Sequence, residues 1–136
     1  MHIRLAACLR HPETLKLALH LMLAGVMAWL AFAFALPGET LANPSFAGFA
    51  ALATEEEWTV LFLVAALVGL TGLLTRSKWV RLLSIGGLST AHGSIAYLFF
   101  FGHSLLPGAP VSTGLGVYAL IAAMGYLLLW VRAFEK

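Results

Sequence analysis

The sequence predicts an all-α integral membrane protein whose four transmembrane helices form an up-down bundle. Of its 136 residues, 61% are hydrophobic and only 10% are charged, whereas soluble domains carry about 25% charged residues. A soluble domain of this length has too high a surface-to-volume ratio to bury so much apolar surface, so we expect lipid to cover it. The single cysteine, Cys8, excludes an intramolecular disulfide and a multi-cysteine metal site.

Four apolar stretches are long enough to cross a bilayer, and we treat residues 1–136 as one membrane domain. A stretch of 20 residues makes a helix about 30 Å long, the thickness of the hydrocarbon core. A basic arm, residues 1–13, precedes the first stretch and resembles the start of a signal peptide. The first stretch is too long for a signal sequence, so we expect a retained helix. The predicted spans are residues 14–36, 58–74, 82–101 and 111–131.

The connection at residues 39–54 is the longest one, and it has its own predicted structure. Asn43 and Pro44 form a helix start. This predicts a short interfacial helix that carries Phe46 and Phe49 and lies on the outer surface of the membrane. A loop without regular structure is the alternative. Thr54 and Glu57 then have the spacing of a capping box, which accounts for the three consecutive glutamates without a Ca²⁺ site.

The positions of the basic residues predict the topology. None of the eight lysines and arginines falls between the first and second spans or between the third and fourth, and four of the six acidic residues, Glu39 and Glu55 to Glu57, lie between the first and second spans. Cytoplasmic loops of membrane proteins carry the excess of Lys and Arg, so both termini and the middle turn are expected in the cytoplasm. The basic residues are Arg4, Arg10, Lys16, Arg76, Lys78, Arg81, Arg132 and Lys136.

The third span has a polar middle, which is the one candidate site. His92 lies there without a nearby charge, and ionisable groups at this depth are costly and often functional. We expect His92 to hydrogen-bond across helices as a structural contact, with a proton or ligand role as the alternative. The possible polar and packing site comprises Ser89, His92, Gly93 and Ser94, and the expected helix-packing glycines are Gly69, Gly72, Gly86, Gly87 and Gly125.

The sequence favours no catalytic residue, metal or cofactor. A haem held by His20 and His92 fits poorly, because His20 is expected about 7 Å deep and His92 about 15 Å deep. Transport is weakly supported because the predicted spans hold no Asp or Glu. Ser89, Ser94 and His92 could in principle supply a nucleophile and a base, but serines on small-residue faces usually serve packing. A net charge of +2 does not suggest nucleic acid as a partner.

The segment from Glu55 onwards has a recognisable order of features. It runs through EEEWTVLFLVAALVGLTGLL, the basic turn RSKWVRLL, a Gly/Ser-rich helix, a proline turn and STGLGVYALIAAMGYLLLW. This order resembles the small multi-pass membrane proteins that tailed bacteriophages and prophages encode. The resemblance implies a phage-encoded, non-enzymatic protein of the bacterial inner membrane with a holin-like, superinfection-exclusion or genome-delivery role, and it carries over no site residues.

Such a protein would act through helix packing, self-association as a homo-oligomer, or a partner in a larger membrane-protein assembly. The alternatives from other classes are an anchor or accessory subunit of a larger membrane complex and a small transporter or channel.

Overall fold

The computed structural model describes residues 12–36, 38, 40–105 and 113–134, and the regular elements of these residues are all helices. The four long helices are α2 (Pro12–Ala35), α4 (Glu55–Leu74), α5 (Lys78–Leu105) and α6 (Thr113–Ala133). Each of them contains a segment that is long and apolar enough to cross a membrane. The prediction of an all-α chain with four such helices is therefore confirmed.

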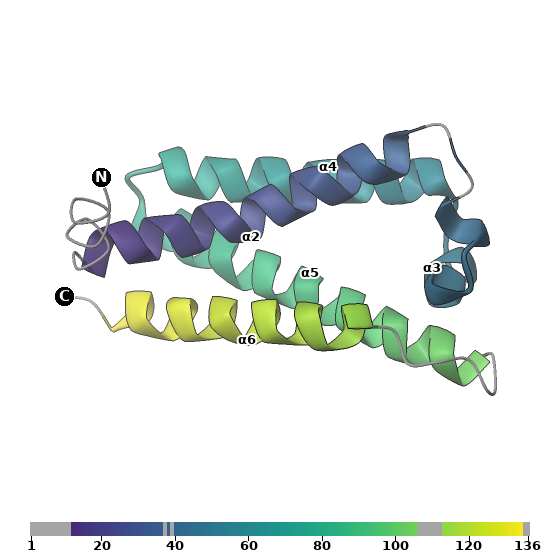
Figure 1. Ribbon diagram of the computed structural model, residues 1–136. Helices are drawn as coiled ribbons and strands as arrows, with labels where there is room; N and C mark the ends of the chain where they lie inside the picture. Colours follow the sequence, from purple (N-terminus) through teal and green to yellow (C-terminus); the bar gives the residue numbers. More distant parts are fainter. Residues whose placement is uncertain (1–11, 37, 39, 106–112, 135–136) are drawn as a thin grey trace, which may run out of the picture.

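Figure 1 shows the four helices running side by side, with α2 packed mainly on α4 and α5 packed mainly on α6. Consecutive long helices run in opposite directions. The start of α2, the end of α6 and the α4–α5 connection therefore lie at one end of the molecule, which we call the basic end. At this end Arg132 Nη1 lies 2.9 Å from Glu13 Oε2, and Lys78 Nζ donates to the Ala133 carbonyl at 3.2 Å.

The helix boundaries differ from the predicted spans by a few residues, and a side-chain cap explains the start of α4. α4 begins at Glu55 rather than at residue 58 because the predicted capping box is present. The Glu57 N–H donates to Thr54 Oγ1 at 3.3 Å, and the Thr54 N–H donates to Glu57 Oε2 at 2.8 Å. α5 begins at Lys78 rather than at residue 82, and its Arg81 donates to the Thr75 carbonyl at the end of α4 at 2.9 Å.

The remaining boundaries lie close to the prediction. α2 begins at Pro12, where the missing N–H of proline costs nothing, and it ends one residue before the predicted boundary at residue 36. α6 continues to Ala133, two residues beyond the predicted end. Residues 111–112, where we predicted the fourth span to begin, and most of the basic arm at residues 1–13 lie outside the described residues.

The first connection does contain a short helix, α3 (Ala47–Ala50), after two 3₁₀ turns, η1 (Thr40–Ala42) and η2 (Pro44–Phe46). Asn43, the predicted helix start, caps η2, and its Oδ1 accepts from the Ser45 N–H at 3.0 Å. A short helix in this connection is therefore present as predicted, and its phenylalanines face the rest of the protein. Phe49 is only 1% exposed and packs with Phe46 among rings of the long helices.

Two glycines explain why α3 packs inward instead of lying flat. A Cβ atom at Gly102 of α5 would lie 2.7 Å from the Gly48 nitrogen, and a Cβ at Gly48 would overlap the Leu98 carbonyl. The backbones of α3 and α5 therefore touch at a point that no larger residue could occupy. Figure 1 shows α3 at the end of the molecule opposite the basic end.

The outer surface of the four long helices is strongly apolar. Leu63, Leu67, Leu120 and Leu127 are each about half exposed or more. Only 22% of the apolar window of α4 and 17% of that of α6 are buried inside the protein. Exposed leucines over much of two helices are what a bilayer requires, because lipid tails are as apolar as leucine.

Candidate functional site

The polar side chains buried among the described residues are His20, Ser84, Ser89 and His92. One comes from α2 and three come from α5. They form three separate arrangements along α5, so the polar middle of the predicted third span is not one site. The arrangements are described below in order from the basic end.

His20 and Ser84 join three helices near the basic end. His20 Nε2 lies 3.1 Å from Ser84 Oγ, and Ser84 Oγ donates to the Val68 carbonyl of α4 at 3.0 Å. Both hydrogen bonds form together in the tautomer of His20 that carries its proton on Nε2, because the serine has a single proton to donate. Gly72 makes the room for this contact, since a Cβ there would overlap the Ser84 side chain and lie 3.1 Å from His20 Cε1.

Ser89 lies one helical turn further along α5 and is fully buried. Its hydroxyl donates to the Ile85 carbonyl of the same helix at 2.7 Å. The Ser89 side chain packs directly on Gly125 of α6, where a Cβ would overlap it and would lie 3.3 Å from Leu23 Cδ1 of α2. Ser89 therefore brings α2, α5 and α6 together by close packing and makes its hydrogen bond within α5.

His92 is the third arrangement and is 0% exposed, so it faces protein as predicted. Its Nδ1 bonds to the Leu88 carbonyl at 2.8 Å, which makes Nδ1 the donor and Nε2 a lone-pair acceptor. Nε2 is buried and has no hydrogen-bond partner among the residues that the structure describes. The hydrogen bond that we predicted between helices is thus formed within α5, because the ring reaches back to the carbonyl four residues earlier.

His92 touches the neighbouring helix through its ring face. It stacks on Tyr118 of α6, with centroids 6.0 Å apart and ring planes at 28°. Tyr118 in turn stacks on Phe99 at 5.8 Å, and Phe99 contacts Phe49 of α3 at 5.1 Å. These rings belong to a larger aromatic cluster, which comprises Phe34, Phe46, Phe49, Trp58, Phe62, Phe99 and Tyr118. Successive ring contacts therefore connect His92, through Tyr118 and Phe99, to Phe49 of α3.

The other predicted site residues lie toward the outside of α5. Ser94 is exposed and donates to the Thr90 carbonyl at 3.0 Å. A Cβ at Gly93 would make an ordinary contact with Ala122 at 3.8 Å. Thr90, which the sequence analysis did not single out, contacts α6, and its Oγ1 lies 2.9 Å from the Tyr126 hydroxyl.

Some of the predicted packing glycines lie at a close approach of two helices, and others do not. A Cβ at Gly69 would lie 2.6 Å from Ala24 Cβ, which places Gly69 at a close approach of α2 and α4. A Cβ at Gly86 would make an ordinary contact with Leu129 at 3.5 Å. Gly87 is exposed, and a Cβ there would meet no atom within 4 Å, so it takes no part in packing within the described chain.

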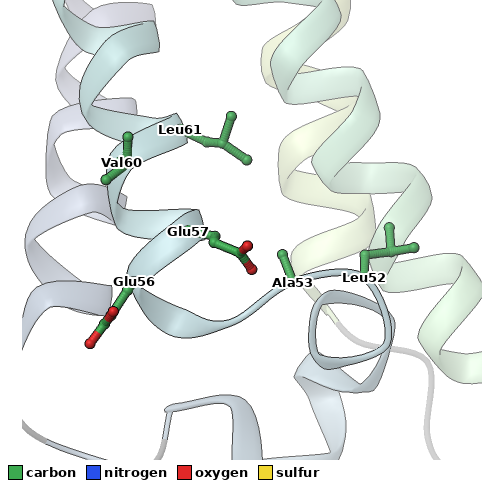
Figure 2. A pocket seen from close by; sticks show the side chains of 6 residues that line it. All are labelled: Leu52, Ala53, Glu56, Glu57, Val60 and Leu61. Carbon is green, nitrogen blue, oxygen red and sulfur yellow. The ribbon is translucent and has the colours of Figure 1, made fainter.

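A surface hollow of about 590 Å³ lies where α3 meets the start of α4 (Figure 2). It is lined by Leu52, Ala53, Glu56, Glu57, Val60 and Leu61. In Figure 2 the Glu57 carboxylate points toward Ala53, while Glu56 and Val60 point to the other side of the helix. Glu57 bonds to both the N–H and the hydroxyl of Thr54 and so serves as a helix cap in this hollow.

The positions of His20, His92 and Ser84 also bear on whether the protein could hold a haem or use a serine as a nucleophile. His92 lies eight residues beyond Ser84, the partner of His20, so the two imidazoles differ by about 12 Å in depth along α5. A haem iron bound between two histidines requires both rings at one depth. The Ser84 hydroxyl is 2% exposed and donates to a carbonyl, which is an arrangement suited to joining helices. Among the described residues no three His, Cys, Asp or Glu side chains could hold a metal ion together.

The sequence analysis missed the His20–Ser84 contact, although a signal for it exists. His20, Gly72 and Ser84 each lie near the end of a span that adjoins basic residues. In an antiparallel bundle these ends meet at a common depth, so matching depths from the topology would have paired them.

No protein-family model matches the chain, and no characterised protein and no solved structure matches it. The function therefore has to be inferred from the residues themselves.

Proposed function

We propose that this protein is a non-enzymatic, multi-pass protein of a bacterial inner membrane, and that it acts by associating with a second copy through the outer face of α5. The observation that carries this proposal is a stripe of exposed residues on that helix. We call it the α5 stripe, and it comprises Leu83, Gly87, Thr90, Ser94 and Tyr97.

The spacing and chemistry of the α5 stripe suit helix association. Its residues follow one another at intervals of four and three, which is the repeat of a helix–helix seam. Gly87 would let a second backbone approach closely, and small and hydroxyl-bearing residues are enriched where membrane helices meet. If this face of α5 met only lipid, we would expect large apolar residues along it. The outer face of α4 has such residues at Leu63, Val64 and Leu67.

The proposed orientation places the basic end in the cytoplasm. The described basic residues Lys16, Arg76, Lys78, Arg81 and Arg132 belong to this end, and Glu55, Glu56 and Glu57 belong to the opposite one. The positive-inside rule then gives an up-down bundle with both termini cytoplasmic and α3 at the outer surface. Cysteines placed at Ser77 and at Ala51 in a Cys8→Ser background test this orientation, because a membrane-impermeant thiol reagent on intact cells should label only the Ala51→Cys variant.

Disulfide cross-linking in membranes tests the association. In the Cys8→Ser background, Ser94→Cys should form a covalent dimer on mild oxidation, whereas Val64→Cys, at a similar depth on the lipid-facing side of α4, should stay monomeric. Adding Gly87→Leu should abolish the Ser94→Cys dimer. Equal cross-linking at both positions would reflect random collision and would contradict the proposal. A Ser94→Cys adduct with a different protein would instead support the accessory-subunit alternative.

The phage setting rests on the resemblance of residues 55–136 to small phage membrane proteins. Expression in a bacterium separates the proposed roles. A sudden loss of membrane potential supports a holin-like role, and survival with resistance to infection supports superinfection exclusion. If neither occurs, the genome-delivery role gains support.

A further inference from the structure

α3 lies between two pairs of long helices at the end opposite the basic end. Figure 1 shows α2 beside α4 and α5 beside α6, with α3 between the two pairs at this end. The Phe49 ring of α3 contacts one ring from each of three long helices, at centroid distances of 6.2, 5.2 and 5.1 Å. These rings belong to Phe34 of α2, Trp58 of α4 and Phe99 of α5. Phe49 therefore joins the two pairs at this end.

His92 lies further into the protein, next to the rings that surround Phe49. Tyr118 stacks on Phe99 at 5.8 Å and on His92 at 6.0 Å. His92 precedes Phe99 by seven residues on α5, so it lies about 10 Å further from the end of the molecule that holds α3. The aromatic contacts around Phe49 therefore lie between His92 and that end.

The ring of His92 presents a free acceptor to the protein interior. Its Nδ1 bonds to the Leu88 carbonyl at 2.8 Å, while Nε2 is buried and has no hydrogen-bond partner in the described part of the chain. Burial of an acceptor without a partner is unfavourable, and an apolar ring would stack on Tyr118 equally well. A histidine at this position therefore suits a protein in which Nε2 receives a hydrogen bond in a second, more open state.

α3 is a small element that depends on its contacts with the long helices. It comprises four residues, Ala47–Ala50, which are too few for a helix that is stable by itself. Besides the ring contacts, it is held by the close approach of Gly48 to Gly102 and by the hydrogen bond from Trp58 Nε1 to the Phe49 carbonyl at 3.1 Å. Since α2 packs directly on α4 and α5 on α6, a local opening can release α3 while the long helices stay packed.

We propose that α3 is a removable plug, and that its release opens His92 Nε2 to a small hydrogen-bond donor from the aqueous phase at this end. Water is the smallest donor of this class. In the closed structure the rings of Phe49, Phe99 and Tyr118 lie between that phase and the histidine. The inference depends on the contacts of α3 and His92, so it is independent of the association through the α5 stripe.

Chemical modification of the native histidine tests the inference. Diethylpyrocarbonate acylates an imidazole through a nitrogen lone pair that it can reach, and peptide mass spectrometry of the detergent-solubilised protein identifies each modified histidine. In the wild type, His92 should react no faster than His20, which is also buried. Phe49→Ala should raise the rate at His92 about tenfold or more and leave that at His20 unchanged, because loss of a buried phenylalanine makes the local opening far more frequent.

Leu52→Ala is the matched control. Leu52 follows α3 closely and is 63% exposed, so its truncation should leave both rates as they are in the wild type. Equal acceleration at His20 and His92 in Phe49→Ala would mean that the whole protein opens, and no acceleration would mean that α3 does not control access. Either result would overturn the proposal.

A second variant releases α3 without removing a ring. A Cβ at Gly102 would lie 2.7 Å from the Gly48 nitrogen, so Gly102→Ala should displace α3 from α5. Modification of His92 should therefore accelerate in this variant too, and a His92 that stayed protected would contradict the plug. This variant decides the matter if Phe49→Ala does not fold.

A charged thiol reagent tests whether the opened route is aqueous. In the Cys8→Ser background, His92→Cys should resist a positively charged methanethiosulfonate, which does not enter apolar phases, and should react once Phe49→Ala is added. Ser89→Cys, at a fully buried position, should stay unreactive in both backgrounds. If the thiol of His92→Cys stayed unreactive with Phe49→Ala, or if Ser89→Cys reacted equally, the proposal would be overturned.

Discussion

The Nε2 atom of His20 on α2 lies 3.1 Å from the hydroxyl oxygen of Ser84 on α5, and that hydroxyl donates to the carbonyl of Val68 on α4. Three helices thus meet through one serine side chain. Ser84→Ala removes this link and takes away the hydrogen-bond partner of the buried His20 Nε2, so we expect a loss of about 1–2 kcal/mol in the free energy of unfolding. Unfolding of the detergent-solubilised protein by increasing SDS, followed by circular dichroism, measures the loss.

Ser94→Ala is the control for this prediction. Ser94 is on the same helix, but it is exposed, and among the described residues its hydroxyl bonds to the Thr90 carbonyl of α5 alone. Its substitution should change the free energy of unfolding by less than about 0.5 kcal/mol. If the two serine variants lost the same stability, the His20–Ser84 bond would contribute nothing beyond what any serine on α5 provides.

Gly72 and Gly125 should be sensitive even to alanine. A Cβ at either position would overlap a serine side chain of α5, so the helices must separate to accommodate it. We expect Gly72→Ala and Gly125→Ala each to cost about 1–3 kcal/mol in the same SDS titration.

Gly25→Ala is the control, because a Cβ there meets no atom within 4 Å. Alanine favours a helix over glycine, so Gly25→Ala should leave the stability unchanged or raise it by up to about 1 kcal/mol. Equal losses at all three glycines would indicate a general intolerance of the fold.

Local patterns made the number and position of the helices predictable. Hydrophobicity over 20 residues, the charges between spans and the Thr54–Glu57 spacing all act within a short stretch of chain, and the capping box was correct to the residue. The inward packing of Phe49 was not predictable in this way. It depends on the contact of Gly48 with Gly102, two residues far apart in the sequence that nothing local connects.

The candidate site likewise has features that the local sequence predicts and features that depend on distant parts of the chain. Burial of His92 follows from the small residues around it in the sequence, but the choice between a bond to Leu88 and one to another helix depends on the side-chain rotamer. The stacking of His92 on Tyr118 depends on the register of α5 against α6. Neither rotamer nor register is encoded in a single helical segment, which is why the interhelical hydrogen bond was predicted wrongly.

His92→Phe should leave the protein as stable as the wild type or slightly more stable. A phenyl ring keeps the stacking surface for Tyr118 and removes Nε2, a buried acceptor that has no partner in the described part of the chain. Replacing an unsatisfied buried polar group by an apolar one of similar shape is nearly neutral or stabilising. The SDS titration is again the measurement. A loss above about 1 kcal/mol would show that Nε2 has a partner in the membrane.

If the protein is a transporter or channel, His92→Ala should abolish a flux while expression and assembly stay intact.

Phe49→Ala should release α3 from the rest of the protein. The Phe49 ring contacts Phe34, Trp58 and Phe99 at centroid distances of 6.2, 5.2 and 5.1 Å, and its carbonyl accepts from Trp58 Nε1 at 3.1 Å. Truncation of a buried phenylalanine costs about 3–5 kcal/mol. The long helices keep their own contacts, so the cost should appear as local opening of the first connection. Hydrogen exchange should therefore accelerate in peptides covering residues 44–53 and stay unchanged in α6. Leu52→Ala, at a side chain that is 63% exposed, should leave exchange in both regions as it is. Acceleration throughout the protein would mean instead that α3 and the four long helices unfold as one unit.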